Sequence, residues 1–198
     1  MEEYMHINTL INTRVHIKHN NGMTLLELII SIAVTSILLG ISAPSFTNII
    51  QNNRIKTTSM ELNRTLAIAR NHAVSMRTTV IVCQADDSSM KTCSEKRERN
   101  TNWKNGIITY ADINANNELD SQDHIITVMQ NNGKTAIVFN QTGRLRFFRN
   151  GSARSAGFYL CNPITHHQRH VRILYTGRVR TSSKIAEEKY QTCLNRAT

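Results

Sequence analysis

The feature that most constrains the fold is a long apolar segment near the N-terminus. No charged residue occurs between Leu28 and Asn53, and the run from Leu25 to Ala43 is almost continuously apolar. At about 1.5 Å of rise per residue, a helix over 23–43 is long enough to cross a hydrocarbon layer of about 30 Å. The sequence therefore predicts a membrane-spanning helix at this position.

The residues before the apolar run argue against an ordinary secretory signal. A polar, weakly basic segment ends at Gly22 and precedes the apolar run, whereas a secretory signal peptide has its cleavage site after that run. Glu27 lies near the start of the run. A carboxylate in lipid is costly and marks a functional position, unless it simply lies among the headgroups of a signal anchor.

The segment from Gly22 to Glu27 (GMTLLE) resembles the class III leader of type IV pilins and of type II secretion pseudopilins. The resemblance implies that a prepilin peptidase cuts after Gly22 and that Met23, where phenylalanine is more usual, becomes the N-methylated first residue. It also implies that Glu27 serves pilus assembly by neutralising a neighbouring subunit's terminal amine. Pro44 matches the proline that kinks the helix in this family.

The remainder of the chain is expected to fold as α+β. Apolar residues recur at helical steps from Phe46 to Ala73, which predicts one helix over about 24–75. Seven short β-branched runs, separated by Asn, Gly and Asp clusters, then predict an antiparallel sheet or sandwich packed on that helix. These runs cover residues 78–84, 106–111, 125–130, 135–140, 145–148, 157–161 and 171–175.

A second resemblance narrows the family. Trp103-x-x-Gly106 leads into a strand and an Asp/Asn-rich turn, and Phe139-Asn140-x-x-Gly143-Arg144 follows later. Both are similar to the FimT/GspH class of minor pilins and pseudopilins, which implies a type IV pilin fold with a long N-terminal helix on a β-rich head. The expected parts are a leader (1–22), a membrane and assembly segment (23–53) and a globular head (54–198).

The excess of positive charge is confined to the last third of the chain. The formal net charge is +10, and residues 134–198 hold twelve Lys and Arg against only Glu187 and Glu188. The rest of the chain is therefore neutral overall. Nine of the twelve cations are arginine, whose planar guanidinium suits phosphate. A solvated basic face is the simpler interpretation, and an anionic partner is the one that we favour.

One arginine motif stands out in this region. Gly177 to Arg180 reads GRVR, and in an extended chain Arg178 and Arg180 project to the same side, about 6.6 Å apart. The segment resembles the C-terminal GRxR of FimT proteins from naturally competent bacteria, which implies DNA binding; the other possibility is a solvated turn. Further candidates are a second motif, Gly143 to Arg146, with Arg144 and Arg146, and an extended patch with Arg149, Arg172 and Lys184.

The four cysteines are expected to form disulfides, because none lies in a C-x-x-C pair and the head is expected outside the cytoplasm. Of the three possible pairings we favour the local one, Cys83–Cys93 with Cys161–Cys193. The second bond would tie the tail onto the head and hold the GRVR segment in shape. Reduction would then weaken DNA binding.

Neither metal nor cofactor is expected. Asp112, Asn114, Asn116, Asp120 and Asp123 partly match a calcium loop, but its turning glycine is missing and Asp123 stands in place of glutamate, so an Asn/Asp turn is favoured. His166, His167 and His170 are expected on a surface loop rather than as ligands. No nucleophile elbow, phosphate loop or zinc-protease motif indicates an enzyme.

The sequence thus predicts a minor pilin that binds extracellular DNA without sequence preference and supports uptake by a type IV pilus in natural transformation. The resemblance implies major and minor pilins and the prepilin peptidase as partners. It also implies the inner membrane of a Gram-negative bacterium, with the head in the periplasm, and an extracellular position after assembly. The alternatives are a GspH-like pseudopilin of type II secretion, and a subunit that primes pilus assembly or adheres to acidic surfaces.

Overall fold

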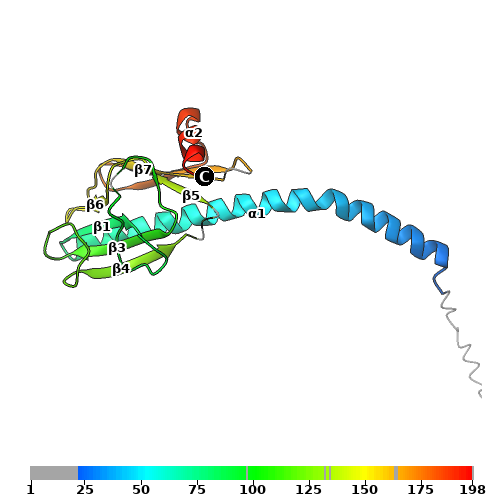
Figure 1. Ribbon diagram of the computed structural model, residues 1–198, viewed down its shortest axis with the longest axis horizontal. Coiled ribbons are helices and arrows are strands. Elements are labelled where there is room, and N and C mark those ends of the chain that lie inside the picture. The colour runs from blue at the N-terminus through cyan, green and yellow to red at the C-terminus, as the bar shows by residue number, and fades with distance from the viewer. Residues whose placement is uncertain (1–21, 97, 132, 134, 163–164, 198) are drawn as a thin grey trace, which may run out of the picture. The chain divides into compact units, whose positions relative to one another are not determined.

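The protein is described here from a computed structural model that covers residues 22–96, 98–131, 133, 135–162 and 165–197, without the side chains of 41–45. The predicted leader, apart from Gly22, lies outside these residues. The chain divides into two units, Met1–Ala43 and Pro44–Thr198, and the helix α1 (Leu25–Ser75) contributes to both (Figure 1). The helix predicted over 24–75 is thereby confirmed. It continues through residue 44, and the kink expected there stays a prediction.

The first unit contains the apolar part of α1. Thr24 caps the helix, because its Oγ1 accepts the backbone N–H of Glu27 at 3.2 Å. Ser31 and Thr35 donate their hydroxyls to the carbonyls four residues earlier, which satisfies polar groups in an apolar stretch. The membrane span predicted over 23–43 finds no support here: among the described residues, no helix combines the length and apolarity needed to cross a membrane.

In the described residues of the second unit, nine antiparallel strands form two sheets. The first has the order β4-β3-β1-β6, with β1 (Thr79–Gln84), β3 (Gly106–Asp112), β4 (His124–Gln130) and β6 (Leu145–Phe147). The second has the order β2-β5-β7-β8-β9, with β2 (Thr101–Asn102), β5 (Ala136–Phe139), β7 (Ala156–Cys161), β8 (Gln168–Ile173) and β9 (Val179–Ser182). A short helix, α2 (Glu187–Asn195), ends the chain.

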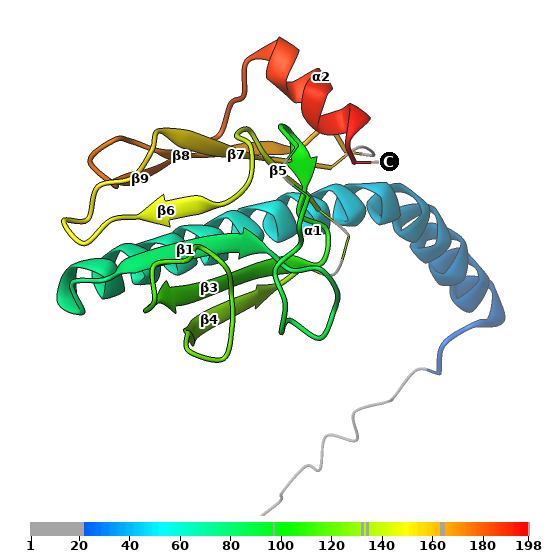
Figure 2. The same ribbon diagram turned by 60° about the vertical axis from the view of Figure 1, so that its left-hand side comes forward.

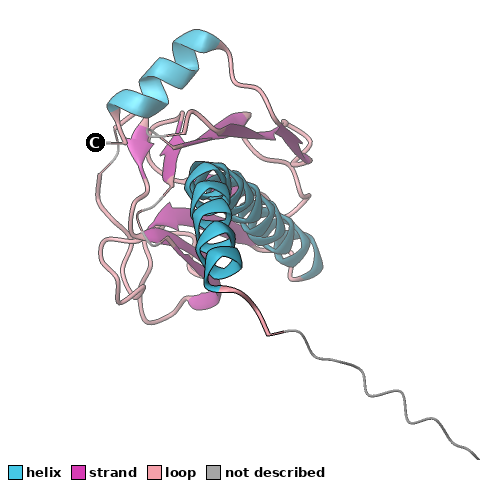
Figure 3. Cartoon of the chain, turned by 90° about the vertical axis from the view of Figure 1, so that its right-hand side faces the viewer, coloured by secondary structure: helices cyan, strands magenta, loops and turns pink. Residues whose placement is uncertain are grey.

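The main core lies between α1 and the inner faces of both sheets. Figure 3 shows α1 with strands on both sides of it. The buried face of α1 runs from Ile55 through Leu66 to Ala73 at helical spacing, and both sheets contribute side chains to the same cluster. The rings of Trp103, Phe139 and Phe158 contact one another in tilted and edge-on arrangements within it. This architecture confirms the α+β fold. Among the described residues, every buried core residue lies at Ile55 or later, so we expect the predicted head, residues 54–198, to fold without the N-terminal part of α1.

The C-terminal tail is more structured than predicted. Strand β8 begins and ends earlier than the run 171–175, and the segment expected to be a polar tail forms β9 and α2. Strand β9 pairs with the edge of β8 and packs Val179 against the main core, although its other residues are polar. Helix α2 packs Tyr190 on the outer face of the second sheet (Figure 2).

Both predicted disulfides are confirmed. Cys83 is bonded to Cys93 and Cys161 to Cys193, with Cα atoms 5.8 and 6.2 Å apart. The second bond joins β7 to α2, so it does tie the tail to the head. The GRVR segment is also held by β8 and by the contacts described below, and whether the bond adds to this stays a prediction.

Candidate nucleic-acid interface

Two of the predicted arginines face each other on neighbouring strands. In the antiparallel register of β8 and β9, Arg172 is the direct partner of Arg180. Their neighbours Val171 and Ile173 are buried toward α1, so both arginines point away from the core and are exposed. Within the described residues, neither guanidinium has a hydrogen bond or an ion pair. Directly opposite like charges repel and destabilise a sheet, so this pair favours a bound anion.

His170 extends this face along β8. Its ring stacks with Tyr159 at 4.8 Å and lies over Gly157, where any Cβ would be 2.6 Å from His170 Nε2. Burial, helped by the positive charges of Lys189 and Arg172, lowers the pKa of this histidine below its usual value. His170 is therefore neutral at neutral pH, and a nearby anion would favour its protonation. The cationic side chains of Lys189 and Arg172 show that the face is basic on both sides of it.

The glycine of the GRVR motif holds the turn between β8 and β9 in place. Gly177 has a φ of +74°, and a Cβ there would lie only 1.9 Å from the carbonyl oxygen of Gly151. Arg70 Nε of α1 donates to the same carbonyl at 3.1 Å. Only glycine therefore allows this turn to rest on the turn that contains Gly151 and, through Arg70, on α1.

Because these two turns touch, Arg149 and Arg178 belong to adjoining exposed segments. Ala153 N–H donates to Tyr175 O at 3.0 Å, which joins the turns a second time. Arg178 also borders a pocket of about 230 Å³ against α1, with Asn63 and Arg70 in its wall. The structure thus places Arg149 and Arg178 on two turns in contact, and Arg172 opposite Arg180 on neighbouring strands; that all four form one patch stays a prediction. Sequence reasoning missed Arg70 and Gly151, and only the Asn150-Gly151 turn signal pointed to the latter.

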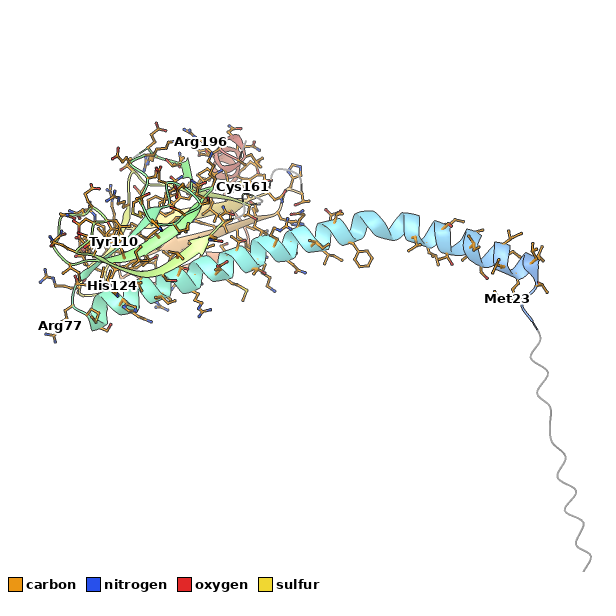
Figure 4. All side chains as sticks on the ribbon, turned by 60° about the horizontal axis from the view of Figure 1, so that its bottom comes forward. Met23, Arg77, Tyr110, His124, Cys161 and Arg196 are labelled. Carbon is orange, nitrogen blue, oxygen red and sulfur yellow. A yellow bond between two sulfur atoms is a disulfide. The ribbon has the colours of Figure 1, made fainter. Side chains whose placement is uncertain are left out.

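Arg144 and Arg146 have different surroundings. The side chain of Arg144 is only 10% exposed; it bonds Glu118 at 2.9 Å and also donates to Asn117 O and the Tyr110 hydroxyl. Tyr110 lies well away from Arg196 at the α2 end of the head (Figure 4). Burial raises the pKa of Tyr110 to about 12, although Arg144 opposes this shift. Arg144 therefore serves the fold and is withdrawn from the interface, whereas Arg146 is exposed on β6. Lys184 is exposed just beyond β9.

The Asp/Asn-rich loop behaves as a turn. The carboxylate of Asp120 accepts the side-chain amides of Asn114 and Asn116, and Asp123 accepts the backbone N–H groups of Ile113 and Asp120. In the described part of the chain, no group of three His, Cys, Asp or Glu side chains is arranged to hold a metal ion. Oxygens that calcium would need are thus engaged within the loop.

The three histidines do not act together. His166 Nδ1 lies 3.1 Å from the Tyr190 hydroxyl, while His170 belongs to β8 rather than to a loop. The prediction of a single surface loop was therefore wrong for His170, because the strand begins earlier than the β-branched residues suggest.

Comparison with known proteins identifies the family. Residues 58–177 match the family described as Type II transport protein GspH, and residues 17–43 match the prokaryotic N-terminal methylation motif. The chain therefore belongs to the GspH family of pilins and pseudopilins, which are structural proteins rather than enzymes. The GspH match ends at Gly177, so Arg178, Arg180 and α2 lie beyond it. No curated protein matches the chain.

Two solved structures share the fold. Both are crystal structures of the type IV minor pilin FimU from Pseudomonas aeruginosa PAO1. One is 19% identical with a TM-score of 0.51, covering 67% of this chain and 97% of FimU. The other is 18% identical with a TM-score of 0.52, covering 68% of this chain and 94% of FimU. This likeness shows the type IV pilin fold.

Proposed function

We propose that this protein is a minor pilin that binds extracellular DNA and supports its uptake by a type IV pilus in natural transformation. The observation that carries the proposal is the exposed pair Arg172 and Arg180, which have no partner in the described structure and face each other across β8 and β9. Phosphates of a nucleic acid would relieve their mutual repulsion. The proposed interface also includes Arg178 and Arg149 on the two adjoining turns, and Lys184 just beyond β9, all of which are exposed.

The binding mechanism is electrostatic. Guanidinium groups on a strand and on turns contact phosphates, which position DNA without reading its bases. Displacement of counterions by these contacts makes affinity fall steeply with salt. Retraction of the pilus by other proteins would then move the captured DNA, and several copies would raise the strength of binding by avidity.

The N-terminal segment supports the pilin part of the proposal. A prepilin peptidase would cut after Gly22 and methylate Met23, and Glu27 would pair with the terminal amine of a neighbouring pilin during assembly. The match to the methylation motif over 17–43 favours this processing. Before assembly the apolar segment would hold the protein in the inner membrane with its head in the periplasm, and afterwards the head would be extracellular.

The test measures duplex DNA binding by the oxidised head, residues 54–198, over several salt concentrations. The Arg172→Ala/Arg180→Ala double variant is expected to bind more weakly and to lose about two units of the slope of log K against log salt. Lys91→Ala/Lys104→Ala removes the same charge from exposed positions elsewhere and is the matched control. Equal losses in both double variants would mean that only total charge matters, and absence of duplex binding at low salt would refute the proposal.

The second candidate is a pseudopilin of type II secretion, or a subunit that primes pilus assembly without binding DNA. The description of the matched family, a type II transport protein, favours it. This candidate predicts no DNA binding by the head and defective secretion or pilus assembly in a deletion strain. The charge of the last third of the chain would then have no role in nucleic-acid capture.

A further inference from the structure

A second basic surface lies beside β6, close in sequence to the turn that contains Arg149. A pocket of about 460 Å³ opens beside β6, within the volume range typical of small-molecule sites. Its walls include Glu118, Gly143, Arg144, Arg146, Phe148 and Arg154. We call it the β6 pocket. Neither the family match nor the GRVR motif accounts for it.

Only some of the charged side chains of the β6 pocket are free to bind a ligand. Arg144 and Glu118 are bonded to each other in the wall and nearly cancel. Arg146 and Arg154 are exposed and have no hydrogen bond or ion pair within the described chain. The pocket therefore presents two free guanidinium groups, each able to bind a phosphate with its planar fork.

An exposed aromatic ring accompanies these two arginines. Phe148 is 45% exposed although its neighbour Phe147 is fully buried in the core. Its backbone is fixed, since Phe148 N–H donates to Ser152 O at 2.9 Å and its carbonyl accepts the N–H of Gly151. A half-exposed phenylalanine in a pocket beside unpaired arginines has the chemistry of a stacking platform for a base.

We infer that the β6 pocket binds a nucleotide of single-stranded DNA, with an unpaired base on Phe148 and flanking phosphates on Arg146 and Arg154. The inference rests on the proposed function and adds to it a preference for unpaired strands. A paired base is stacked within its duplex and cannot lie on the ring. The Arg172/Arg180 surface, which holds phosphates on an open sheet face, would bind duplex and single strands alike.

The test compares three labelled ligands bound to the oxidised head, residues 54–198. They are oligo-dT of about 12 nucleotides, an abasic strand with the same number of phosphates, and a duplex. Phe148→Leu keeps an apolar side chain but removes the stacking ring. It is expected to weaken oligo-dT binding about 5- to 150-fold and to leave the abasic strand and the duplex unchanged.

Two further variants make the test specific. Phe148→Trp is expected to restore oligo-dT binding, and its fluorescence should be quenched by oligo-dT but not by the abasic strand. Tyr175→Leu removes an aromatic ring that is 73% exposed on the β8–β9 turn. It should leave the preference for oligo-dT over the abasic strand unchanged. Arg146→Gln/Arg154→Gln should weaken both single strands and reduce their salt slope by about one unit or slightly more.

Each of the other results overturns the inference. Equal weakening of all three ligands by Phe148→Leu would assign that ring a structural role, and no weakening would exclude stacking. Loss of the oligo-dT preference in Tyr175→Leu would place the base on the β8–β9 turn instead. If a sulfated polysaccharide binds with the same dependence on Phe148, the pocket recognises sugars. Duplex binding that depends on Arg172 and Arg180 would in every case leave the proposed function intact. Its absence would refute the proposed function, whereas the pocket inference stands or falls with the dependence of oligo-dT binding on Phe148.

Discussion

Replacing Gly177 by alanine tests whether the GRVR turn is held by close contact with Gly151 and α1. The φ of +74° costs an alanine about 1–2 kcal/mol relative to glycine. The new Cβ would also lie 1.9 Å from the backbone oxygen of Gly151, so the two turns must separate. Separation breaks the bond from Arg70 to that oxygen, which is worth about 1.5–3 kcal/mol because its donor is charged.

We therefore expect Gly177→Ala to lower the free energy of unfolding by about 2.5–5 kcal/mol. For a head of this size, that loss corresponds to a fall in Tm of about 10 °C. Urea denaturation of the oxidised head, followed by circular dichroism, measures it by linear extrapolation. DNA affinity should fall as well, because Arg178 and Arg149 would no longer lie on adjoining turns.

Gly143→Ala is the matched control. Gly143 also has a φ of +74°, but no other atom lies within 4 Å of the Cβ position. This variant should lower the free energy of unfolding only by the cost of the positive φ for alanine, about 1–2 kcal/mol. If both variants lose the same stability, close contact does not hold the turn, and the reasoning about the glycine of the motif is refuted.

Three other predictions follow from the same contacts. Replacing Cys161 and Cys193 together by serine opens a loop of 32 residues and should cost about 3–4 kcal/mol of stability. Affinity for duplex DNA should stay nearly unchanged, because β9 remains paired with β8. A large loss of affinity in a binding titration would contradict this. Arg144→Ala should destabilise the head by about 1–3 kcal/mol without changing the salt slope, and a changed slope would return Arg144 to the interface. Burial lowers the pKa of His170, so below about pH 6.5 the folded state binds fewer protons than the unfolded state. The free energy of unfolding should therefore fall as the pH drops below that value. The variant His170→Asn should flatten this part of the pH profile of Tm, and an unchanged profile would show that another group is responsible.

Much of the fold follows from local patterns. The helical spacing of apolar residues predicted α1 almost to the residue, and β-branched runs separated by turn residues predicted most of the strands. The disulfide pairing also followed, because sequence-local cysteines lie on neighbouring segments of the head. Such features depend on residues close together in the chain, where spacing carries the information.

The candidate site was predicted in composition but not in arrangement. Charge counting singled out Arg172, Arg178 and Arg180, but the β8–β9 register that sets Arg172 opposite Arg180 depends on pairing between strands. In the segment from Gly143 to Arg146 (GRLR), nothing in the sequence indicated that Arg144 forms a salt bridge with Glu118, which lies 26 residues earlier.

By itself, then, the amino-acid order determined the α+β class, the N-terminal motif, the cysteine pairing and the location of the excess charge. Tertiary structure decided which arginines are free to bind and which are not. Hydrophobic periodicity is a property of neighbouring residues, whereas the availability of a guanidinium depends on partners that only folding brings within a few ångströms. Gly177 belongs to both levels, because its motif was visible in sequence but its contact with Gly151 and Arg70 was not.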